Sequence, residues 1–361
     1  MKGLRLFLPP FAPDTAGAAS VLYPLGGLVV IVDAGGCAGN ICGFDEPRFS
    51  VPQKTASVFT SAALRDMDAI LGRDQHLIHH IKETIADFQS IGHTFPFIAL
   101  VGTPVPAVIG TDLAALARLL EQDLGIPVIA IDTDGTEAYD VGIGKTYDAL
   151  FHHVARIPSQ IAPRPGTLGV LGATTLDVGS DAAAPLRTLL QNNGWNAIRL
   201  YGFDSDLTQY ATAAQNEKNL VIAPAGLPAA RWLKQTFHTP YEIAYPLAKR
   251  LLAQAVDAVP LPKTAKNILI LHQQIAARTL RELLQARYPD ACIACATYFQ
   301  QIGAIAKPQD IKLRDESDLP ALVQAKSYDV ILGDPLYQRV LADDIGTFLP
   351  IPHPAVSGFP E

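Results

Sequence analysis

The chain has 361 residues, with 28 Lys and Arg against 35 Asp and Glu, and a net charge of −7. A chain of this length exceeds what one hydrophobic core usually serves, so we expect two or three domains. The acidic balance, without a cluster of Lys and Arg, argues against nucleic acid or an anionic membrane surface as a partner. Small molecules and other proteins are the expected partners.

We expect no export signal at the N-terminus. Pro9, Pro10 and Pro13 interrupt the apolar residues far short of the apolar stretch of a signal peptide. The longest apolar run, residues 21–32, is broken by Pro and Gly and is too short to span a bilayer. We therefore expect a cytoplasmic protein. Its 4 cysteines are too few for a disulfide scaffold in a chain of this length.

Short apolar runs that end in Gly, Pro or Asp alternate with stretches of helical periodicity. This alternation predicts an α/β protein built from βα units with mainly parallel sheets. The expected strands lie within residues 28–36, 97–104, 126–135, 166–174, 196–202, 219–226, 267–273, 291–299 and 328–334. Helices are expected within residues 62–88, 111–125, 182–194 and 277–289.

Two connections rich in proline and small residues, 157–166 and 255–266, divide the expected strands into three groups. We therefore expect three Rossmann-like domains: residues 1–162, which include a glycine-rich loop, residues 163–260 and residues 261–361. Ligands of open parallel sheets gather at the carboxyl ends of the strands. The segments where a site is expected are residues 34–42, 102–111, 132–140 and 172–177, and the residues from His272 onward.

Cys37 and Cys42 follow the first expected strand, in the glycine-rich loop. Gly35, Gly36 and Gly39 allow the backbone to bend tightly and to approach a bulky inorganic cluster, whose sulfides accept hydrogen bonds from N–H groups. A cubane needs about four ligands, so two copies of the loop would have to face each other across a twofold axis. The alternative is two buried free thiols in a tight turn, because unligated cysteine is among the most buried residue types.

A series of motifs runs along nearly the whole chain in a characteristic order. They include PPFAPDTAGAASVLYPLGG, DAGGCAGNICGFDEPR, LVGTPVPAVIGTDL, IDTDGTEAYDVG, NLVIAPAGLPAARWL, YDVILGDPLYQRVL and IPHPAVSG. In this order they resemble component 1 of the nitrogenase superfamily, to which light-independent protochlorophyllide reductase and the reductive cyclase of nickel-tetrapyrrole biosynthesis also belong.

The resemblance implies paired subunits of three Rossmann-like domains that hold an iron–sulfur cluster between them, with electrons delivered by a separate ATP-hydrolysing iron–sulfur reductase. Cys37 matches the cluster cysteine of the family, and the position of a further family cysteine is Thr103. Cys42 is the expected substitute. Two ligands per subunit then hold a [4Fe-4S] cluster in a homodimer or in a pair of homologous subunits. The expected function is the transfer of electrons to an unsaturated small-molecule substrate.

Three residues are weaker candidates for substrate contact or proton donation: His272, Arg48 and Thr103. A lone His is more often a hydrogen-bonded loop residue, and Arg48 can simply pair with a neighbouring acid. Two other functions remain open. One is a non-enzymatic scaffold that stores or matures a metal cluster, and the other is a cluster-free subunit whose partner performs the chemistry.

Two further motifs are not expected to bind a ligand. Cys292 and Cys295 form a CxxC inside an expected strand, with no second CxxC or nearby His, which favours two buried thiols over a zinc site. The GIGKT segment, residues 142–146, lacks the first glycine of a phosphate-binding loop because Tyr139 stands there. We therefore expect no ATP hydrolysis by this chain.

Overall fold

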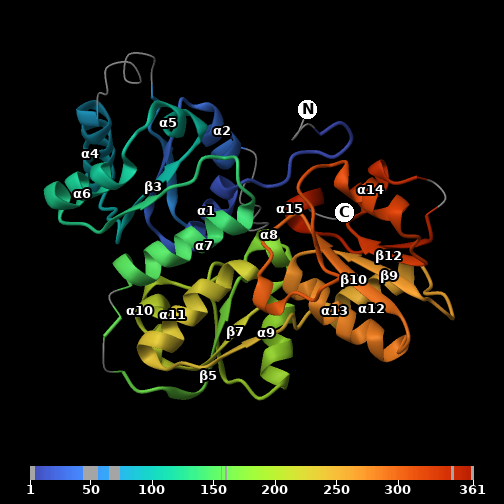
Figure 1. Ribbon diagram of the computed structural model, residues 1–361. Coiled ribbons are helices and arrows are strands. Elements are labelled where there is room, and N and C mark those ends of the chain that lie inside the picture. Colours follow the sequence, from blue (N-terminus) through green and yellow to red (C-terminus); the bar gives the residue numbers. More distant parts are fainter. Residues whose placement is uncertain are drawn as a thin grey trace.

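The structure, a computed structural model, describes residues 5–43, 56–64, 74–155, 157–158, 161–342 and 345–358; only the backbone is described for residues 42, 43 and 74. Three parallel sheets follow one another along the chain, and Figure 1 shows each with its helices as a lobe. The predicted α/β class with parallel sheets is confirmed. We call these the first, second and third lobes, in chain order.

The first lobe contains a four-stranded parallel sheet of order β2-β1-β3-β4. Its strands are β1 (Leu28–Val32), β2 (Val58–Ser61), β3 (Ile98–Gly102) and β4 (Val128–Ile131). Its helices are α1 (Asp14–Leu22), α2 (Gly36–Gly43), α4 (Asp74–Ser90), α5 (Pro104–Ile109), α6 (Leu113–Leu124) and α7 (Tyr139–Ala149). Alternate residues of β1 belong to two different cores, one with α4 and α6 and the other with α1 and α7.

The second lobe contains a parallel sheet of order β6-β5-β7-β8. Its strands are β5 (Arg164–Leu171), β6 (Ala197–Leu200), β7 (Asn216–Val221) and β8 (Tyr241–Ile243). Its helices are α8 (Thr175–Val178), α9 (Ala183–Asn192), α10 (Leu207–Ala211), α11 (Leu227–Phe237) and α12 (Ala248–Ala258).

The third lobe contains a five-stranded parallel sheet of order β11-β10-β9-β12-β13. Its strands are β9 (Asn267–Leu271), β10 (Cys292–Thr297), β11 (Ile311–Lys312), β12 (Val330–Gly333) and β13 (Thr347–Pro350). Its helices are α13 (Gln274–Arg287), α14 (Asp318–Ala325) and α15 (Pro354–Ser357). One buried core runs through all three sheets, so the domain boundaries at residues 162 and 260 stay a prediction.

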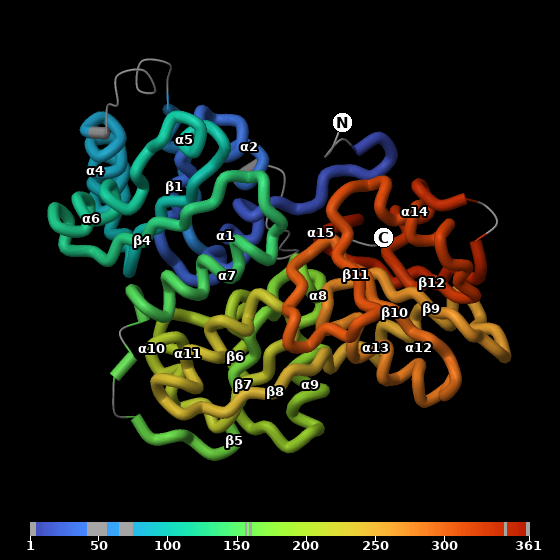
Figure 2. The backbone as a smooth tube through the Cα atoms, viewed as in Figure 1, coloured from blue at the N-terminus to red at the C-terminus, as the bar shows by residue number. Residues whose placement is uncertain are grey.

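Helix α7 crosses α1 with direct contact between the two backbones. A Cβ atom added to Gly17 would lie 1.9 Å from the carbonyl oxygen of Tyr139, and one added to Gly142 would lie 1.9 Å from that of Asp14. Only glycine permits this approach. In Figure 2, α7 runs between the first and second lobes. The GIGKT segment lies inside this helix and not in a phosphate-binding loop.

The N-terminal segment, residues 5–13, leads from the third lobe to α1 (Figure 2). The carboxylate of Glu316 accepts backbone hydrogen bonds from Leu6, at 3.1 Å, and from Leu8, at 2.7 Å. The N–H group of Ala12 donates to the carbonyl oxygen of Ala355. Within the described ranges, no helix has both the length and the apolar character that a membrane span requires.

Strand β10 separates the two cysteines of the CxxC motif. Residues three positions apart on a strand point to opposite faces of the sheet. Cys295 is buried, and its burial raises the pKa of the thiol to about 12. Cys292 is exposed, with its Sγ atom 3.2 Å from Nζ of Lys326. The expectation of two buried thiols is therefore wrong for Cys292, and the two sulfur atoms cannot bind one ion together.

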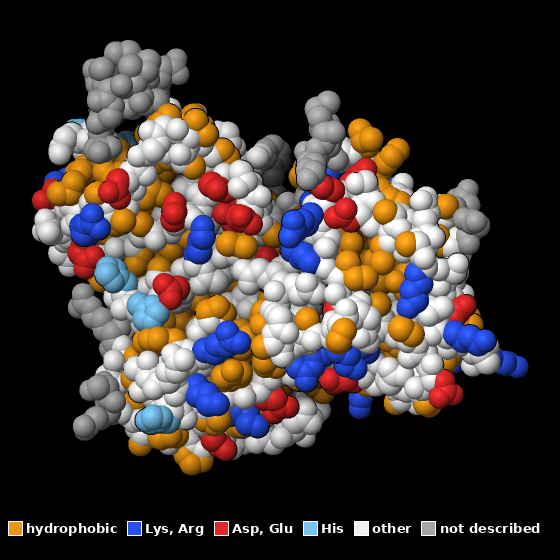
Figure 3. All heavy atoms as spheres, viewed as in Figure 1, with side chains coloured by type: hydrophobic (Ala, Val, Ile, Leu, Met, Phe, Trp, Pro, Cys, Tyr) orange, Lys and Arg blue, Asp and Glu red, His pale blue; other side chains and the backbone are white. Residues whose placement is uncertain are grey.

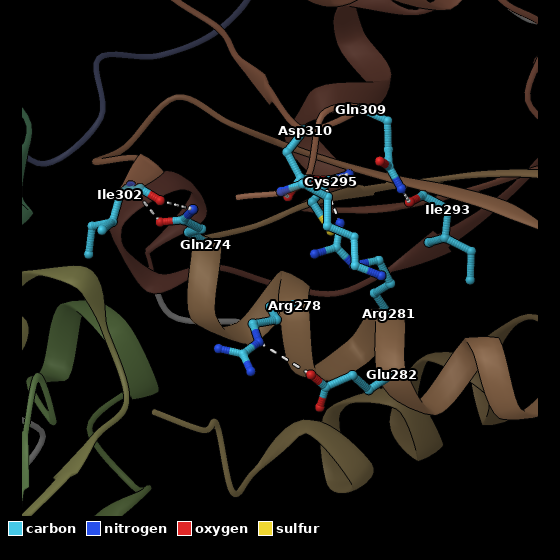
Figure 4. Close-up of polar contacts among 10 residues, drawn as sticks. Gln274, Arg278, Arg281, Glu282, Ile293, Cys295, Ile302, Gln309 and Asp310 are labelled. Carbon is cyan, nitrogen blue, oxygen red and sulfur yellow. Dashed lines mark hydrogen bonds and ion pairs between the residues drawn. The ribbon is translucent and has the colours of Figure 1, made fainter. Parts of the chain in front are cut away.

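Two arginines of helix α13 form ion pairs, one of them buried and the other exposed to solvent (Figure 4). Arg281 pairs with Asp310, and each side chain is 3% exposed. The same carboxylate accepts the N–H of Cys295 at 3.2 Å, which connects the helix to β10. Arg278 pairs with Glu282 at 3.2 Å, with 35% and 62% of the side chains exposed.

We expect Asp310→Ala to lower the free energy of unfolding by about 3–5 kcal/mol, because it leaves the buried Arg281 guanidinium without a counter-charge. Glu282→Ala is the matched control on the same helix, and its exposed pair is worth less than about 1 kcal/mol. Urea denaturation measures both values. Equal, small losses in the two variants would contradict the structural role of the buried pair.

Candidate functional site

The carboxyl ends of the four strands of the first sheet meet along one edge, and Cys37 lies there. Asp33 follows β1. Its carboxylate accepts hydrogen bonds from the N–H of Ala38, at 2.8 Å, and from Oγ of Ser61, at 2.7 Å. Gly35 has a φ of 112°, a conformation that favours glycine. The predicted glycine-rich loop is therefore a helix, α2, because this turn and the Asp33 cap allow residue 36 to begin one.

Thr103 follows β3 and lies beside Cys37. Its side chain is fully buried, and its Oγ1 atom donates to the carbonyl oxygen of Val32 at 2.8 Å. Burial raises the pKa of the Cys37 thiol, and the negative charge of Asp33 raises it further, whereas a hydrogen bond with the Thr103 hydroxyl opposes both. The structure thus brings two of the predicted site residues together and favours a neutral thiol at Cys37.

With respect to the described residues, the surface around Cys37 is open and partly apolar. Gly35, Gly36 and Gly39 are exposed, and a Cβ atom added to any of them would have no atom within 4 Å. Helix α5 follows Thr103, and Figure 1 places α5 close to α2. Its exposed apolar side chains are Val105, Val108 and Ile109, of which Val108 is 86% exposed. We call the surface of α2 and α5 the Cys37 face.

The structure describes one of the two predicted cluster ligands. Cys37 is a half-buried free thiol, whereas the side chain of Cys42, in the last turn of α2, and the whole of Arg48 lie outside the described residues. In the described part of the chain, no three His, Cys, Asp or Glu side chains come together to hold a metal ion. Cys37 fits the role of one ligand in a shared site, since the surrounding glycines leave room for a bulky group.

His272 lies in a different part of the molecule, at the carboxyl end of β9. Its ring is 2% exposed and lies 4.6 Å from the ring of His353, between centroids. Burial lowers the pKa of His272 to about 4, and a hydrogen bond with the backbone of Pro352 opposes the shift. The ring is therefore neutral near pH 7, which removes the imidazolium as a proton donor there.

Three side chains, one from each lobe, form a buried hydrogen-bonded chain beside His272. The hydroxyl of Tyr139 donates to Oδ1 of Asp177 at 2.7 Å and lies 3.4 Å from Nε2 of His353. Nδ1 of His353 accepts the N–H of Ala355, so a neutral ring carries its hydrogen on Nε2 and donates it to Tyr139. We call Tyr139, Asp177 and His353 the junction triad.

Within the junction triad, Asp177 is the group whose pKa shift makes stability depend on pH near neutrality. Burial raises its pKa to about 8, and the negative charge of Asp140 adds to the shift, against hydrogen bonds from Tyr139 and Thr174. The sequence placed Tyr139, Asp140 and Asp177 in segments where a site was expected. It gave no indication that they would meet His353, because only the packing of the three lobes brings these residues together.

Comparisons with known proteins agree with this architecture. The family model of nitrogenase component 1 type oxidoreductases matches residues 13–248. The nitrogenase iron-molybdenum cofactor biosynthesis protein NifE of Klebsiella pneumoniae is 25% identical over an alignment of 238 residues that covers 62% of this chain and 50% of that protein. NifE of Mesorhizobium japonicum is 24% identical over an alignment of 280 residues that covers 72% of this chain and 54% of that protein.

The chain spans about half the length of the curated relatives it matches. A solved structure, nitrogenase Cp1 at pH 6.5, aligns with a TM-score of 0.69 over 98% of this chain and 88% of that chain, at 11% identity. Another, nitrogenase Cp1 at pH 5, gives a TM-score of 0.64 at 14% identity over 92% of this chain and 81% of that chain. At these identities the likeness shows the fold.

We expect the free energy of unfolding to fall as pH rises from about 6.5 to about 8. Asp177 holds its proton to about pH 8 in the folded protein but loses it near pH 4 in the unfolded chain. Folding therefore takes up a proton in this window, and stability falls by at most about 1.4 kcal/mol per pH unit. The buried His272 has the opposite effect on stability, but only below its unfolded pKa of about 6.5.

Urea denaturation at several pH values measures this slope. Asp177→Asn keeps an acceptor oxygen for Tyr139 but cannot titrate, so its stability should change less with pH than that of the wild type. Asp290→Asn, at an exposed position, is the control and should keep the wild-type slope. An undiminished slope in Asp177→Asn would show that another group titrates.

Proposed function

The chain belongs to the family of nitrogenase component 1 type oxidoreductases, and on this premise we propose that it is the cluster-holding component of a nitrogenase-like reductase. Cys37 and Cys42 from each of two facing subunits hold a [4Fe-4S] cluster, which supplies one-electron transfer when bound. The electron donor is a separate iron–sulfur ATPase, and the acceptor is an unsaturated small molecule.

The observation that carries this proposal is the position of Cys37 on a face that no other described residues cover. A purely structural thiol is normally buried in apolar surroundings, but this thiol is half-buried and lies among glycines with open space beside them. The exposed apolar side chains of α5 form a patch of the kind that marks a protein interface. A second subunit on the Cys37 face would cover this patch and add its own cysteines.

Thr103 and Asp33 adjust the affinity of Cys37 for iron. A thiol must lose its proton to become a ligand, and Asp33 together with burial makes this loss less favourable. A hydrogen bond with the Thr103 hydroxyl lowers the pKa of Cys37 and so opposes both effects. Thr103 thus has a positioning and tuning role at the place where the family resemblance puts a cysteine.

A scaffold for cofactor assembly is the second candidate function. The relatives named above are biosynthesis proteins of the iron-molybdenum cofactor, and such a role would use Cys37 to hold a cluster in transit. The two functions differ in the fate of the cluster. A reductase keeps its cluster through cycles of reduction and oxidation, whereas a scaffold gives it up to an apo-protein.

Anaerobic purification followed by iron and sulfide analysis tests the shared cluster. We expect about four irons per dimer, with a loss of at least half in Cys37→Ala and in Cys42→Ala. Cys292→Ala is the control, because this exposed thiol lies on a distant strand, and it should keep the wild-type content. Iron that persists in Cys37→Ala, or its absence after reconstitution of the wild type, would overturn the proposal.

A transfer assay separates the two functions. The loaded protein is mixed with an apo-ferredoxin that accepts [4Fe-4S] clusters, and each protein's electron paramagnetic resonance spectrum is recorded after separation and reduction. Signal retained by this protein through repeated redox cycles supports the reductase. Signal that moves to the ferredoxin supports the scaffold.

A further inference from the structure

A cleft of about 1080 Å³ lies between the first and third lobes. Its walls come from the N-terminal segment, the connection from β4 to α7, and the loops that follow β10 and β11. Three cations line it: Arg5, Lys312 and Arg314. The chain as a whole has a net charge of −7, so a group of three cations at one place differs from its overall negative charge. Figure 3 shows Lys and Arg side chains in the hollow between the two upper lobes.

The two acids of the cleft, Glu137 and Asp140, offset this charge only in part, because the lining has three cations. Glu137 is exposed to solvent, where its field is screened. Asp140 is 1% exposed, and its Oδ2 atom accepts the N–H of Gln300 at 2.7 Å. Its Oδ1 atom is buried without a hydrogen-bond partner among the described residues. Burial raises the pKa of Asp140 to about 6, so the carboxylate still keeps most of its negative charge at pH 7.

Lys312 is held at the wall of the cleft by its own backbone neighbours. Its Nζ atom donates to the carbonyl oxygen of Tyr298 at 2.8 Å and also to that of Phe299. An ammonium group has three donors, so one N–H remains for a ligand. Burial lowers the pKa of Lys312, while the charge of Asp140 opposes this shift.

Arg5 is fixed by the N-terminal segment. Its guanidinium carbon lies 3.7 Å from the ring centroid of Phe11, and its NH1 group donates to the carbonyl oxygen of Pro9 at 2.8 Å. Glu316 anchors this segment to the third lobe through the backbone of residues 6–8. None of the ion pairs in the described part of the chain involves Arg5, Lys312 or Arg314. Arg5 and Lys312 are thus held in place by contacts other than ion pairs.

We propose that this cleft binds a small molecule with two or more carboxylate or phosphate groups. Guanidinium groups bind both kinds of anion through paired N–H donors, and an ammonium adds a point charge. The volume leaves room for an organic body of the size of a cofactor. That this molecule is the substrate rests on the reductase function proposed above, whereas its binding requires no cluster.

Isothermal titration calorimetry with citrate and with pyrophosphate tests the proposal on the full chain. We expect at least one of these probes to bind, and the tighter one identifies carboxylate or phosphate as the preferred group. Arg314→Gln and Lys312→Met should each weaken binding at least tenfold. Arg118→Gln, at an exposed position on α6, is the control and should bind like the wild type.

Asp140→Asn is a further test, in which the affinity for the probe should rise and not fall. It removes the remaining negative charge without a change of shape, so binding at pH 7 should tighten several-fold. Circular dichroism melts establish that each variant is folded, and Arg314→Gln decides the outcome if Lys312→Met unfolds. Binding of neither probe, or equal binding by wild type and Arg314→Gln, would overturn the proposal.

The cluster and the cleft can fail separately. Cys37→Ala should bind the anionic probe with wild-type affinity, because Cys37 does not line the cleft. Probe binding without iron in the wild type would leave the cleft proposal standing and overturn the reductase. Iron in the wild type without probe binding would leave the cluster proposal standing and overturn the cleft proposal.

Discussion

The contact between the backbones of α1 and α7 is the constraint on which the rest of the structure depends. Gly17 and Gly142 remove the side chains that would hold these helices apart. The first turn of α7 then lies between the lobes. Tyr139 reaches Asp177 of the second lobe and His353 of the third, while Asp140 accepts a hydrogen bond from Gln300 at the cleft. The first turn of α7 therefore positions Tyr139 in the junction triad and Asp140 in a wall of the cleft.

Two polar environments of different character result from this arrangement. At the Cys37 face, a half-buried thiol lies beside a carboxylate and a helix with exposed apolar side chains, which is a surface suited to a partner. Inside the molecule, the junction triad is fully enclosed, and burial shifts its carboxyl group towards the neutral form. The chemistry of the Cys37 face depends on the partner that binds there. The junction triad is complete within one chain and connects its three lobes.

Every predicted strand corresponds to an observed one, and the strands that the sequence did not reveal are all at sheet edges. These are β2, β8, β11 and β13, with 4, 3, 2 and 4 residues. Inner strands of a parallel sheet are buried on both faces and carry continuous apolar runs. The four missed strands carry no such run, whereas the edge strands β4 and β6 were predicted, so edge position alone does not explain the misses. The helix at Gly36–Gly43 was missed for another reason, because its glycines indicate a loop unless a cap such as Asp33 is recognised.

The sequence by itself determined the α/β class, the inner strands, the family resemblance and the position of Cys37 after the first strand, because all of these depend on local pattern and chain order. The tertiary structure alone decided which distant polar groups meet. Tyr139, Asp177 and His353 are far apart in sequence, and so are Arg5 and Lys312. Their proximity follows from the way the three lobes meet near the start of α7. No periodicity in the sequence encodes contacts of that range.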